Sequence, residues 1–186
     1  MAEFVIAEVY KLFYVYYLKV TANYINPIYV QSLKMDYYDS IAQGYNELHK
    51  EEQLKKIAII RKHLKPKGKL LDIGAGTGIS TEPFLKECEC YALDPSKEML
   101  KQSKAQHNIV GSAEKLPFPD KFFDVIISLT ALHLSDLKKS LAEIRRVSRD
   151  NAQIALTFLK KSKNKPKSLK GFKKIEEEKD IIFIKL

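Results

Sequence analysis

The stretch Lys69-Leu-Leu-Asp-Ile-Gly-Ala-Gly-Thr-Gly-Ile-Ser80 decides the fold of this chain. Its first half is a short apolar run typical of a buried strand, and its second half has glycine at every other position. Glycine lets the backbone turn tightly and lets a ligand approach it without meeting a Cβ atom. The next residues, Thr81-Glu-Pro-Phe-Leu85, predict the start of a helix. We therefore expect a strand, a glycine turn and a helix N-terminus that face a ligand together.

Helices and strands alternate around this stretch. Apolar residues at helical spacing predict helices over 37–49 and 51–64, and helices are also expected over 95–106 and 136–148. Further strands are expected at 90–94, 108–112, 123–129 and 153–159, and residues 172–178 and 180–186 predict a hairpin. The alternation predicts an α/β fold, a Rossmann-like, doubly wound and mostly parallel sheet with a C-terminal antiparallel hairpin. In such a sheet, ligands bind beyond the carboxyl ends of the strands.

Composition limits the partners and the compartment. The 186 residues are enough for one domain with a substantial core, and the net charge of +9 favours anionic partners, nucleic acid first. A Lys-rich and Glu-rich surface of the kind found in heat-adapted proteins explains the charge equally well. Cys88 and Cys90 are the only cysteines, so no disulfide framework is implied and a cytoplasmic setting fits.

Residues 1–34 differ from the rest of the chain. They are rich in aromatic residues, but their longest uncharged run, 20–33, has 14 residues and includes Pro27, which is too short and too polar for a transmembrane helix. A membrane-surface helix is the functional alternative. Because the orderly pattern starts directly after Met35, we expect translation to begin there. Residues 1–34 would then be an N-terminal extension from an upstream start, and 35–186 the domain.

Two carboxylates flank the glycine turn. Asp72 lies two residues before its first glycine, where it suits a ligand that carries an ammonium group. Asp94 ends the next strand and can accept the hydroxyls of a ribose, or else serve as the N-cap of the following helix. A dinucleotide fingerprint would need glycine or alanine three residues after Gly76, where this chain has Ile79. The pattern therefore disfavours a dinucleotide oxidoreductase.

Between Tyr37 and about Leu159 the sequence resembles the class I S-adenosylmethionine-dependent methyltransferases, in the subgroup that includes quinone-biosynthesis enzymes. The resemblance rests on five motifs: Tyr38-Asp-x-Ile-Ala-x-x-Tyr45, Leu71-Asp-Ile-Gly-Ala-Gly-Thr-Gly78, Ala92-Leu-Asp-Pro-Ser96, Gly111-Ser-Ala-Glu-Lys-Leu-Pro-Phe-Pro-Asp120 and Phe123-Asp-Val-Ile-Ile-Ser128. These motifs are specific for the fold and the cofactor and nearly silent about the methyl acceptor. The resemblance implies that 35–186 is a methyltransferase domain that binds S-adenosyl-L-methionine.

The resemblance also implies roles for individual residues. Asp72 and the glycine turn would hold the methionine part of the cofactor, Asp94 the ribose, and Met99 the adenine ring. The full set of implied cofactor-binding residues is Tyr45, Asp72, Gly74, Ala75, Gly76, Gly78, Asp94, Pro95, Met99, Ser112, Ala113, Glu114 and Leu129. Many relatives have aspartate where this chain has Ser112, and a neutral hydroxyl makes a weaker hydrogen bond to the adenine amino group.

The transfer step needs little from the protein beyond positioning, because the sulfonium of the cofactor activates the methyl group. A base helps only where the acceptor starts protonated. His133, just after the fourth strand, is the candidate base, and its alternative is a loop histidine that shapes the pocket. Tyr37, Tyr38 and His49 are secondary candidates of the same kind.

The acceptor is left open between RNA, which we favour, and a small molecule such as a quinone precursor. Lys160–Lys174 holds eight lysines and no acidic residue, so it is expected either to bind RNA phosphates or to be a solvated linker. The chain has little sequence for a lid over the pocket, which favours a large substrate or a small activator protein that completes the site. The alternative from another class is a non-catalytic module that binds the cofactor or RNA.

Overall fold

The computed structural model describes residues 37–42 and 44–186. The expected N-terminal extension, 1–34, and the expected start at Met35 lie outside these described residues. No helix within them is long and apolar enough to cross a membrane.

One seven-stranded sheet forms the centre of the molecule, with strand order β3-β2-β1-β4-β5-β7-β6. Its strands are β1 (Gly68–Ile73), β2 (Cys88–Asp94), β3 (His107–Val110), β4 (Phe123–Leu129), β5 (Ser148–Leu159), β6 (Lys173–Glu176) and β7 (Asp180–Lys185). The first five run parallel, and β7 pairs antiparallel with both β5 and β6. The order reverses at β1, between β2 and β4, which is where a ligand binds in such sheets.

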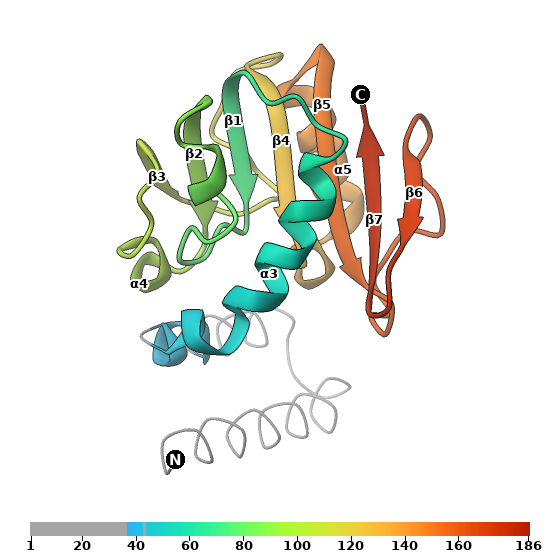
Figure 1. Cartoon of the computed structure of the whole chain (residues 1–186). Coiled ribbons are helices and arrows are strands. Elements are labelled where there is room, and N and C mark those ends of the chain that lie inside the picture. The colour runs from blue at the N-terminus through green and yellow to red at the C-terminus, as the bar shows by residue number, and fades with distance from the viewer. Residues whose placement is uncertain (1–36, 43) are drawn as a thin grey trace.

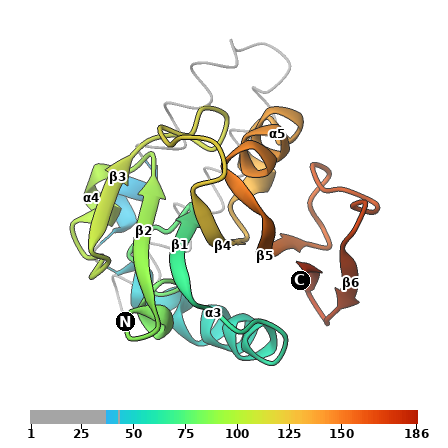
Figure 2. The same cartoon turned by 90° about the horizontal axis from the view of Figure 1, so that it is seen from above.

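Helices cover both faces of this sheet (Figures 1 and 2). The helix α3 (Tyr45–Arg61) crosses one face, and α5 (Leu137–Val147) lies on the other. Shorter elements are α4 (Lys97–Leu100) and the 3-10 turns η1 (Glu82–Phe84) and η2 (Leu132–Leu134). The two faces have separate cores, because residues alternate between them along each strand: Leu70 packs with Ile57 and Ile60 of α3, while Leu71 packs with Ile144 and Val147 of α5.

The predicted fold class is confirmed, with a mostly parallel sheet and a C-terminal antiparallel hairpin. The predicted N-cap at Asp136 is also present, since Asp136 Oδ1 accepts a hydrogen bond of 3.2 Å from the amide of Lys139. The fourth strand has the bounds expected for it, Phe123–Leu129.

Two predicted helices are much shorter than expected. After the glycine turn the structure has only η1, and β2 begins soon afterwards, at Cys88, which leaves no room for a longer helix. The helix expected over 95–106 ends at Leu100, where α4 gives way to turns before β3. The glycine turn therefore does not lead into an α-helix. Its backbone amides donate instead to the carbonyl of Leu93 and to the carboxylate of Asp94.

The N-terminal helices divide at a different place from the predicted one. A single helix, α3, runs through Lys50, and the break lies at Gly44, where the sequence analysis had placed helix. Glycine has a low helix propensity because its unfolded backbone is the most mobile of any residue. The shift matters because it puts Tyr45 at the first position of the helix that crosses the sheet.

Candidate functional site

The glycine turn joins the carboxyl ends of β1 and β2. The amides of Gly74 and Ala75 both donate to the carbonyl of Leu93, at 2.7 and 3.1 Å. Gly74 has φ +73°, and a Cβ atom there would lie 2.2 Å from that of Ala131, so the segment after β4 approaches too closely for a side chain. Gly76 has φ +56° and open space where its Cβ would point. The turn is thus closed toward the segment after β4 and open at Gly76.

Asp94 closes this turn from the end of β2. Its Oδ2 accepts from the amide of Gly76 at 2.9 Å, and its Oδ1 accepts from the amide of Ser96 at 2.8 Å. Burial raises the pKa of the Asp94 carboxyl and the negative charge of Asp39 adds to the rise, while the two amides oppose it. Ser96, not Asp94, is the N-cap of α4, accepting from the amide of Met99 at 3.0 Å. A carboxylate has about four acceptor sites, so Asp94 retains capacity for ligand hydroxyls.

Asp72 is fully buried beneath the turn. Its Oδ2 accepts from the hydroxyls of Ser80 and Thr81 at 2.6 and 2.7 Å, while its Oδ1 is buried and has no hydrogen-bond partner among the described residues. Burial raises the pKa of Asp72 to about 6, against the lowering effect of the two hydroxyls. An unpartnered carboxylate oxygen directly under an open glycine turn fits a ligand that carries a positive charge.

A pocket opens over the turn and gathers most of the predicted site residues. The predicted residues that line it are Tyr45, Gly74, Gly76, Asp94, Pro95, Met99, Ser112, Ala113, Glu114 and Leu129. They come from α3 and α4, from the ends of β1, β2 and β4, and from the loop after β3. The pocket therefore lies at the carboxyl ends of the strands, on both sides of the point where their order reverses.

The other predicted residues are placed differently. Asp72, Ala75 and Gly78 lie behind the pocket wall and do not line it. His133 lies in η2 between the lining residues Leu132 and Leu134, half buried, and is not itself among the lining residues. Its assignment as a base stays a prediction.

Several residues of the wall were not predicted from the sequence to bind the cofactor. These are Tyr38, Ile73, Leu93, Ala131, Leu132, Leu134 and Ser135. Most of them could have been found by position, because residues at or directly after the carboxyl end of a parallel strand face the ligand side of the sheet. Tyr38 could have been found from its spacing of seven residues to Tyr45, and the two ring centroids lie 6.4 Å apart.

Two tyrosines cover the pocket from the N-terminal side. Burial is the main cause that raises the pKa of Tyr38 to about 12, and it raises the pKa of Tyr45 further. Both phenols therefore stay protonated at neutral pH. They can therefore donate hydrogen bonds to a ligand.

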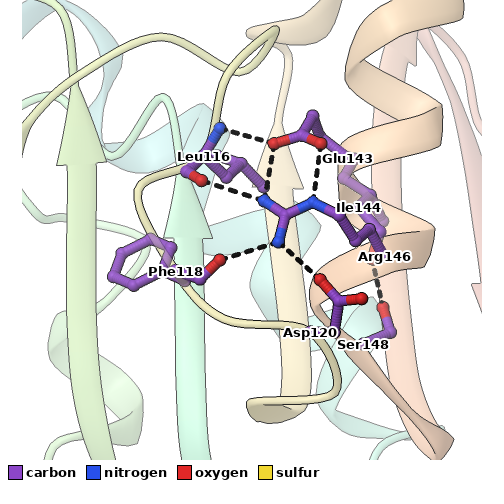
Figure 3. A network of polar contacts seen from close by, with 7 residues as sticks. All are labelled: Leu116, Phe118, Asp120, Glu143, Ile144, Arg146 and Ser148. Atoms are coloured by element: carbon purple, nitrogen blue, oxygen red, sulfur yellow. Dashed lines mark hydrogen bonds and ion pairs between the residues drawn. The ribbon is translucent and has the colours of Figure 1, made fainter.

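Arg146 of α5 fixes the backbone at Leu116 and Phe118 (Figure 3), which closely follows the pocket residues Ser112, Ala113 and Glu114 in the chain. Its guanidinium donates to the carbonyls of Leu116 and Phe118 at 3.0 and 2.8 Å and to the carboxylate of Asp120 at 2.9 Å. It also forms a bidentate pair with Glu143, at 2.8 and 2.7 Å.

Glu143 completes this network, because its Oε2 accepts from the amide of Leu116 at 2.8 Å. Glu114, on the pocket wall, is held in turn by the amide of Asp136, which donates to Glu114 Oε1 at 2.9 Å. One wall of the pocket is thus attached to α5 at two points.

The lysine-rich segment Lys160–Lys174 is anchored at the pocket rim. The side-chain amide of Asn164 donates to the carbonyls of His133 and Ser135, both at 2.9 Å, and Ser135 lines the pocket. Leu169 and Phe172 pack against the core on the α5 face. All the lysines of the segment except Lys165 are exposed. The described part of the chain holds no group of three His, Cys, Asp or Glu side chains that could bind a metal ion.

The donor set of the pocket fits S-adenosylmethionine. Asp94 offers acceptors for ribose hydroxyls, and Met99 and Ala113 offer an apolar surface for a base. Asp72 does not line the pocket, but its buried carboxyl adds negative charge beneath the turn. The open face at Gly76 gives a ligand access to the backbone. A dinucleotide fits less well, because Ile79 stands where its fingerprint has glycine or alanine and no α-helix N-terminus follows the turn to bind a pyrophosphate.

Comparisons with known proteins agree with this geometry. The family model described as a methyltransferase domain matches residues 71–156. An uncharacterised protein of Methanocaldococcus jannaschii is 38% identical over 128 residues, which are 66% of this chain and 50% of that protein. The ubiquinone/menaquinone biosynthesis C-methyltransferase UbiE of Burkholderia mallei is 32% identical over 113 residues, which are 54% of this chain and 46% of that enzyme. The chain thus spans about half the length of these curated relatives.

A solved structure supports the fold. It is the complex of the Haloferax volcanii Trm112 methyltransferase activator with a protein described as a methyltransferase. The match has a TM-score of 0.60 at 19% identity and covers 65% of this chain and 59% of that one.

Proposed function

Because the chain belongs to the class I S-adenosylmethionine-dependent methyltransferases, we propose that it transfers a methyl group from S-adenosylmethionine to RNA. The observation that carries the cofactor half of this proposal is the position of Asp94, which closes the glycine turn through Gly76 and still faces the pocket. The acceptor half rests on the lysine-rich segment at the rim of the same pocket.

Different residues along the pocket would bind different parts of the cofactor. Asp94 would hold the ribose, Met99, Ser112, Ala113 and Glu114 the adenine, and Asp72 with the glycine turn the amino-acid tail. When bound, S-adenosylmethionine supplies a methyl group that its sulfonium already activates. Tyr38 and Tyr45 cover the pocket as neutral phenols, which excludes water from the site and orients the groups inside it.

Two hydrogen bonds and two exposed lysines support RNA as the acceptor. Asn164 holds the lysine-rich segment against the carbonyls of His133 and Ser135, so the basic side chains start at the pocket mouth. Lys161 and Lys163, on either side of the anchor, are exposed and make no ion pair within the described residues. Exposed lysines of this kind beside the pocket suit a polyanion, although Lys160 and Lys174 at the ends of the segment pair with Glu176.

Transfer of labelled methyl groups into fractionated cell extract tests the proposal. We expect label from S-adenosylmethionine in the RNA fraction, in amounts that rise with time and with enzyme. Label that enters only protein or only small molecules would contradict RNA as the acceptor, and no label in any fraction would contradict the activity.

A small-molecule acceptor is the second candidate, and the identity to UbiE supports it. The pocket wall is largely apolar near Leu129, Leu132 and Leu134, which suits an aromatic acceptor. Label in the lipid-soluble fraction of the same extract would favour this alternative.

A small activator protein is a further proposal. The Haloferax volcanii protein of similar fold was solved in complex with the Trm112 activator. In this chain, few described residues stand over the pocket besides the N-terminal region, so a partner would help to exclude water. Co-purification of the tagged chain from its own host, followed by mass spectrometry, tests for such a partner, and recovery of the chain alone at full activity would contradict the proposal.

A further inference from the structure

A buried lysine lies next to the pocket without lining it. Lys56 belongs to the buried face of α3, together with Gln53, Ile57 and Ile60. Its side chain is only 5% exposed. A charged ammonium is rarely buried so completely, because it loses its hydration unless partners replace the water.

Lys56 connects three elements of the fold. Its Nζ lies 2.6 Å from Oε1 of Glu52 on the same helix and 3.2 Å from Oδ2 of Asp180 at the start of β7. It also donates a hydrogen bond of 3.1 Å to Oγ1 of Thr130, directly after β4. Of these partners, Thr130 lines the pocket.

Thr130 has an unusual backbone conformation. Its φ is +54°, in the left-handed region that β-branched residues rarely adopt. Its amide donates to Oγ1 and to the carbonyl of Thr157, at 2.9 and 3.2 Å. Thr157 holds the backbone of Thr130 and Lys56 holds its side chain, so contacts from two sides maintain a conformation that costs about 1–3 kcal/mol.

The place of Thr130 in the sheet identifies the part of the pocket that it shapes. Asp94 and the adenine wall lie at the ends of β2 and β3, whereas Thr130 lies beyond β1, at the end of β4. A ligand whose ribose is at Asp94 and whose tail crosses the glycine turn therefore reaches Thr130 with its tail end. The reacting methyl group is on the sulfur that joins this tail to the ribose, so the position of the tail helps to set the position of the methyl group.

We propose that Lys56 is a positioning residue, which holds Thr130 in place and so shapes the tail end of the cofactor pocket. This role rests on the proposed function, because it assumes that the pocket binds S-adenosylmethionine. Lys56 does not touch the ligand in this account. It acts through Thr130, and Glu52 and Asp180 balance its charge.

Neighbouring lysines on α3 provide a matched test. Lys55 forms the same i,i+4 pair, with Glu51 at 2.7 Å, but its side chain is 73% exposed. The variants Lys56→Met and Lys55→Met are titrated by calorimetry with S-adenosylhomocysteine, which has the tail, and with adenosine, which lacks it. We expect Lys56→Met to raise the Kd for S-adenosylhomocysteine about tenfold. Its Kd for adenosine, and both constants of Lys55→Met, should change less than about twofold.

Each outcome decides a separate point. Lys56→Met that binds S-adenosylhomocysteine like the wild type, or that weakens both ligands equally, overturns the positioning role. A wild type that binds neither ligand rejects the proposed function itself. Should Lys56→Met fail to fold, Thr130→Val removes the hydroxyl that Lys56 contacts and keeps the side-chain shape. Thr130→Val should raise the Kd for S-adenosylhomocysteine and leave the Kd for adenosine nearly unchanged. If Thr130→Val does not weaken S-adenosylhomocysteine selectively, the proposal is overturned.

Discussion

Individual residues at the glycine turn favour S-adenosylmethionine as the ligand of the pocket. Asp94 uses both of its oxygens to hold backbone amides of the segments on either side of it, so the same carboxylate shapes the turn and faces the pocket. Sequence alone places this carboxylate correctly, because it ends a strand that is easy to recognise. The hydrogen bond to Gly76 is visible only in the structure, because it depends on how the turn folds back.

Replacing Asp94 tests the ribose contact. Asp94→Asn keeps the shape of the side chain but removes the negative charge and one acceptor, so we expect the Kd for S-adenosylhomocysteine to rise about 10- to 100-fold. Calorimetric titration measures this change. Asp150→Asn is the control, because Asp150 is an exposed carboxylate paired with Lys121 far along the chain from the turn. Equal affinities of Asp94→Asn and wild type would remove Asp94 from the site.

The buried carboxyl of Asp72 predicts a dependence of stability on pH. Burial raises its pKa to about 6 in the folded chain, whereas an unfolded aspartate has a pKa near 4. The folded state therefore holds the proton more tightly, and the stability that this provides is present below about pH 4 and is lost as the pH rises through about 6. The loss amounts to about 3 kcal/mol.

The variant Asp72→Asn cannot titrate and isolates this effect. We expect the stability of the wild type relative to Asp72→Asn to fall between pH 4.5 and 7, as measured by urea unfolding of the ligand-free chain. A difference that is constant over this range, or that grows with pH, would contradict the raised pKa of Asp72.

At the scale of elements, α5 holds one wall of the pocket through Arg146 (Figure 3). The predicted bounds of this helix were nearly correct, because Asp136 is a strong N-cap and the apolar residues have helical spacing. Its function as an anchor was not predicted. Arg146 and Glu143 appear in the sequence as ordinary exposed charges, and only the fold brings them to the loop at Leu116 and Phe118.

Arg146→Lys tests this anchor. Lysine cannot form the bidentate pair with Glu143 or reach several acceptors at once, so the loop should loosen. We expect a lower melting temperature and a Kd for S-adenosylhomocysteine that rises about threefold to tenfold. The matched control is Arg145→Lys, since Arg145 is its exposed neighbour on α5. Identical behaviour of the two variants would show that the anchor has no influence on the pocket.

The elements around the glycine turn show the limits of prediction from sequence. All the strands of the sheet were located, most of them from short apolar runs, but β5 begins at Ser148 and not at the predicted residue 153, because its first residues are polar. The helices after the turn and after β2 were expected to be longer, since the sequence pattern does not report the tertiary turns that end them at Phe84 and Leu100. Nothing in the sequence distinguishes Lys56 from the other lysines of its predicted helix, because its burial against β7 depends on contacts between distant parts of the chain.

At the scale of the whole molecule, the charge distribution favours an anionic substrate. Exposed lysines of the 160–174 segment lie near the pocket, whereas Lys62, Lys65 and Lys67 lie at the opposite ends of the strands, before β1. The two groups differ in position but not in chemistry. Variants of the two groups can therefore distinguish specific contact of RNA with the 160–174 segment from a general effect of the net charge.

Removing three charges from either group tests the RNA surface. We expect Lys161→Gln, Lys163→Gln and Lys167→Gln together to weaken binding of bulk tRNA and to lower the slope of log Kd against log salt by about 2. The triple variant of Lys62, Lys65 and Lys67 to glutamine should keep most of the wild-type slope. Electrophoretic shift over a series of salt concentrations measures both. Equal losses in the two variants would contradict a specific basic surface at the pocket.

Binding of S-adenosylmethionine in the pocket over the glycine turn underlies all the roles proposed above. Calorimetric titration of the full chain with S-adenosylhomocysteine, with NAD in parallel, tests it most directly. The geometry of Asp72, Asp94 and Gly76 predicts saturable binding of one S-adenosylhomocysteine per chain and no binding of NAD. No heat of binding with S-adenosylhomocysteine, or equal binding of NAD, would contradict the account.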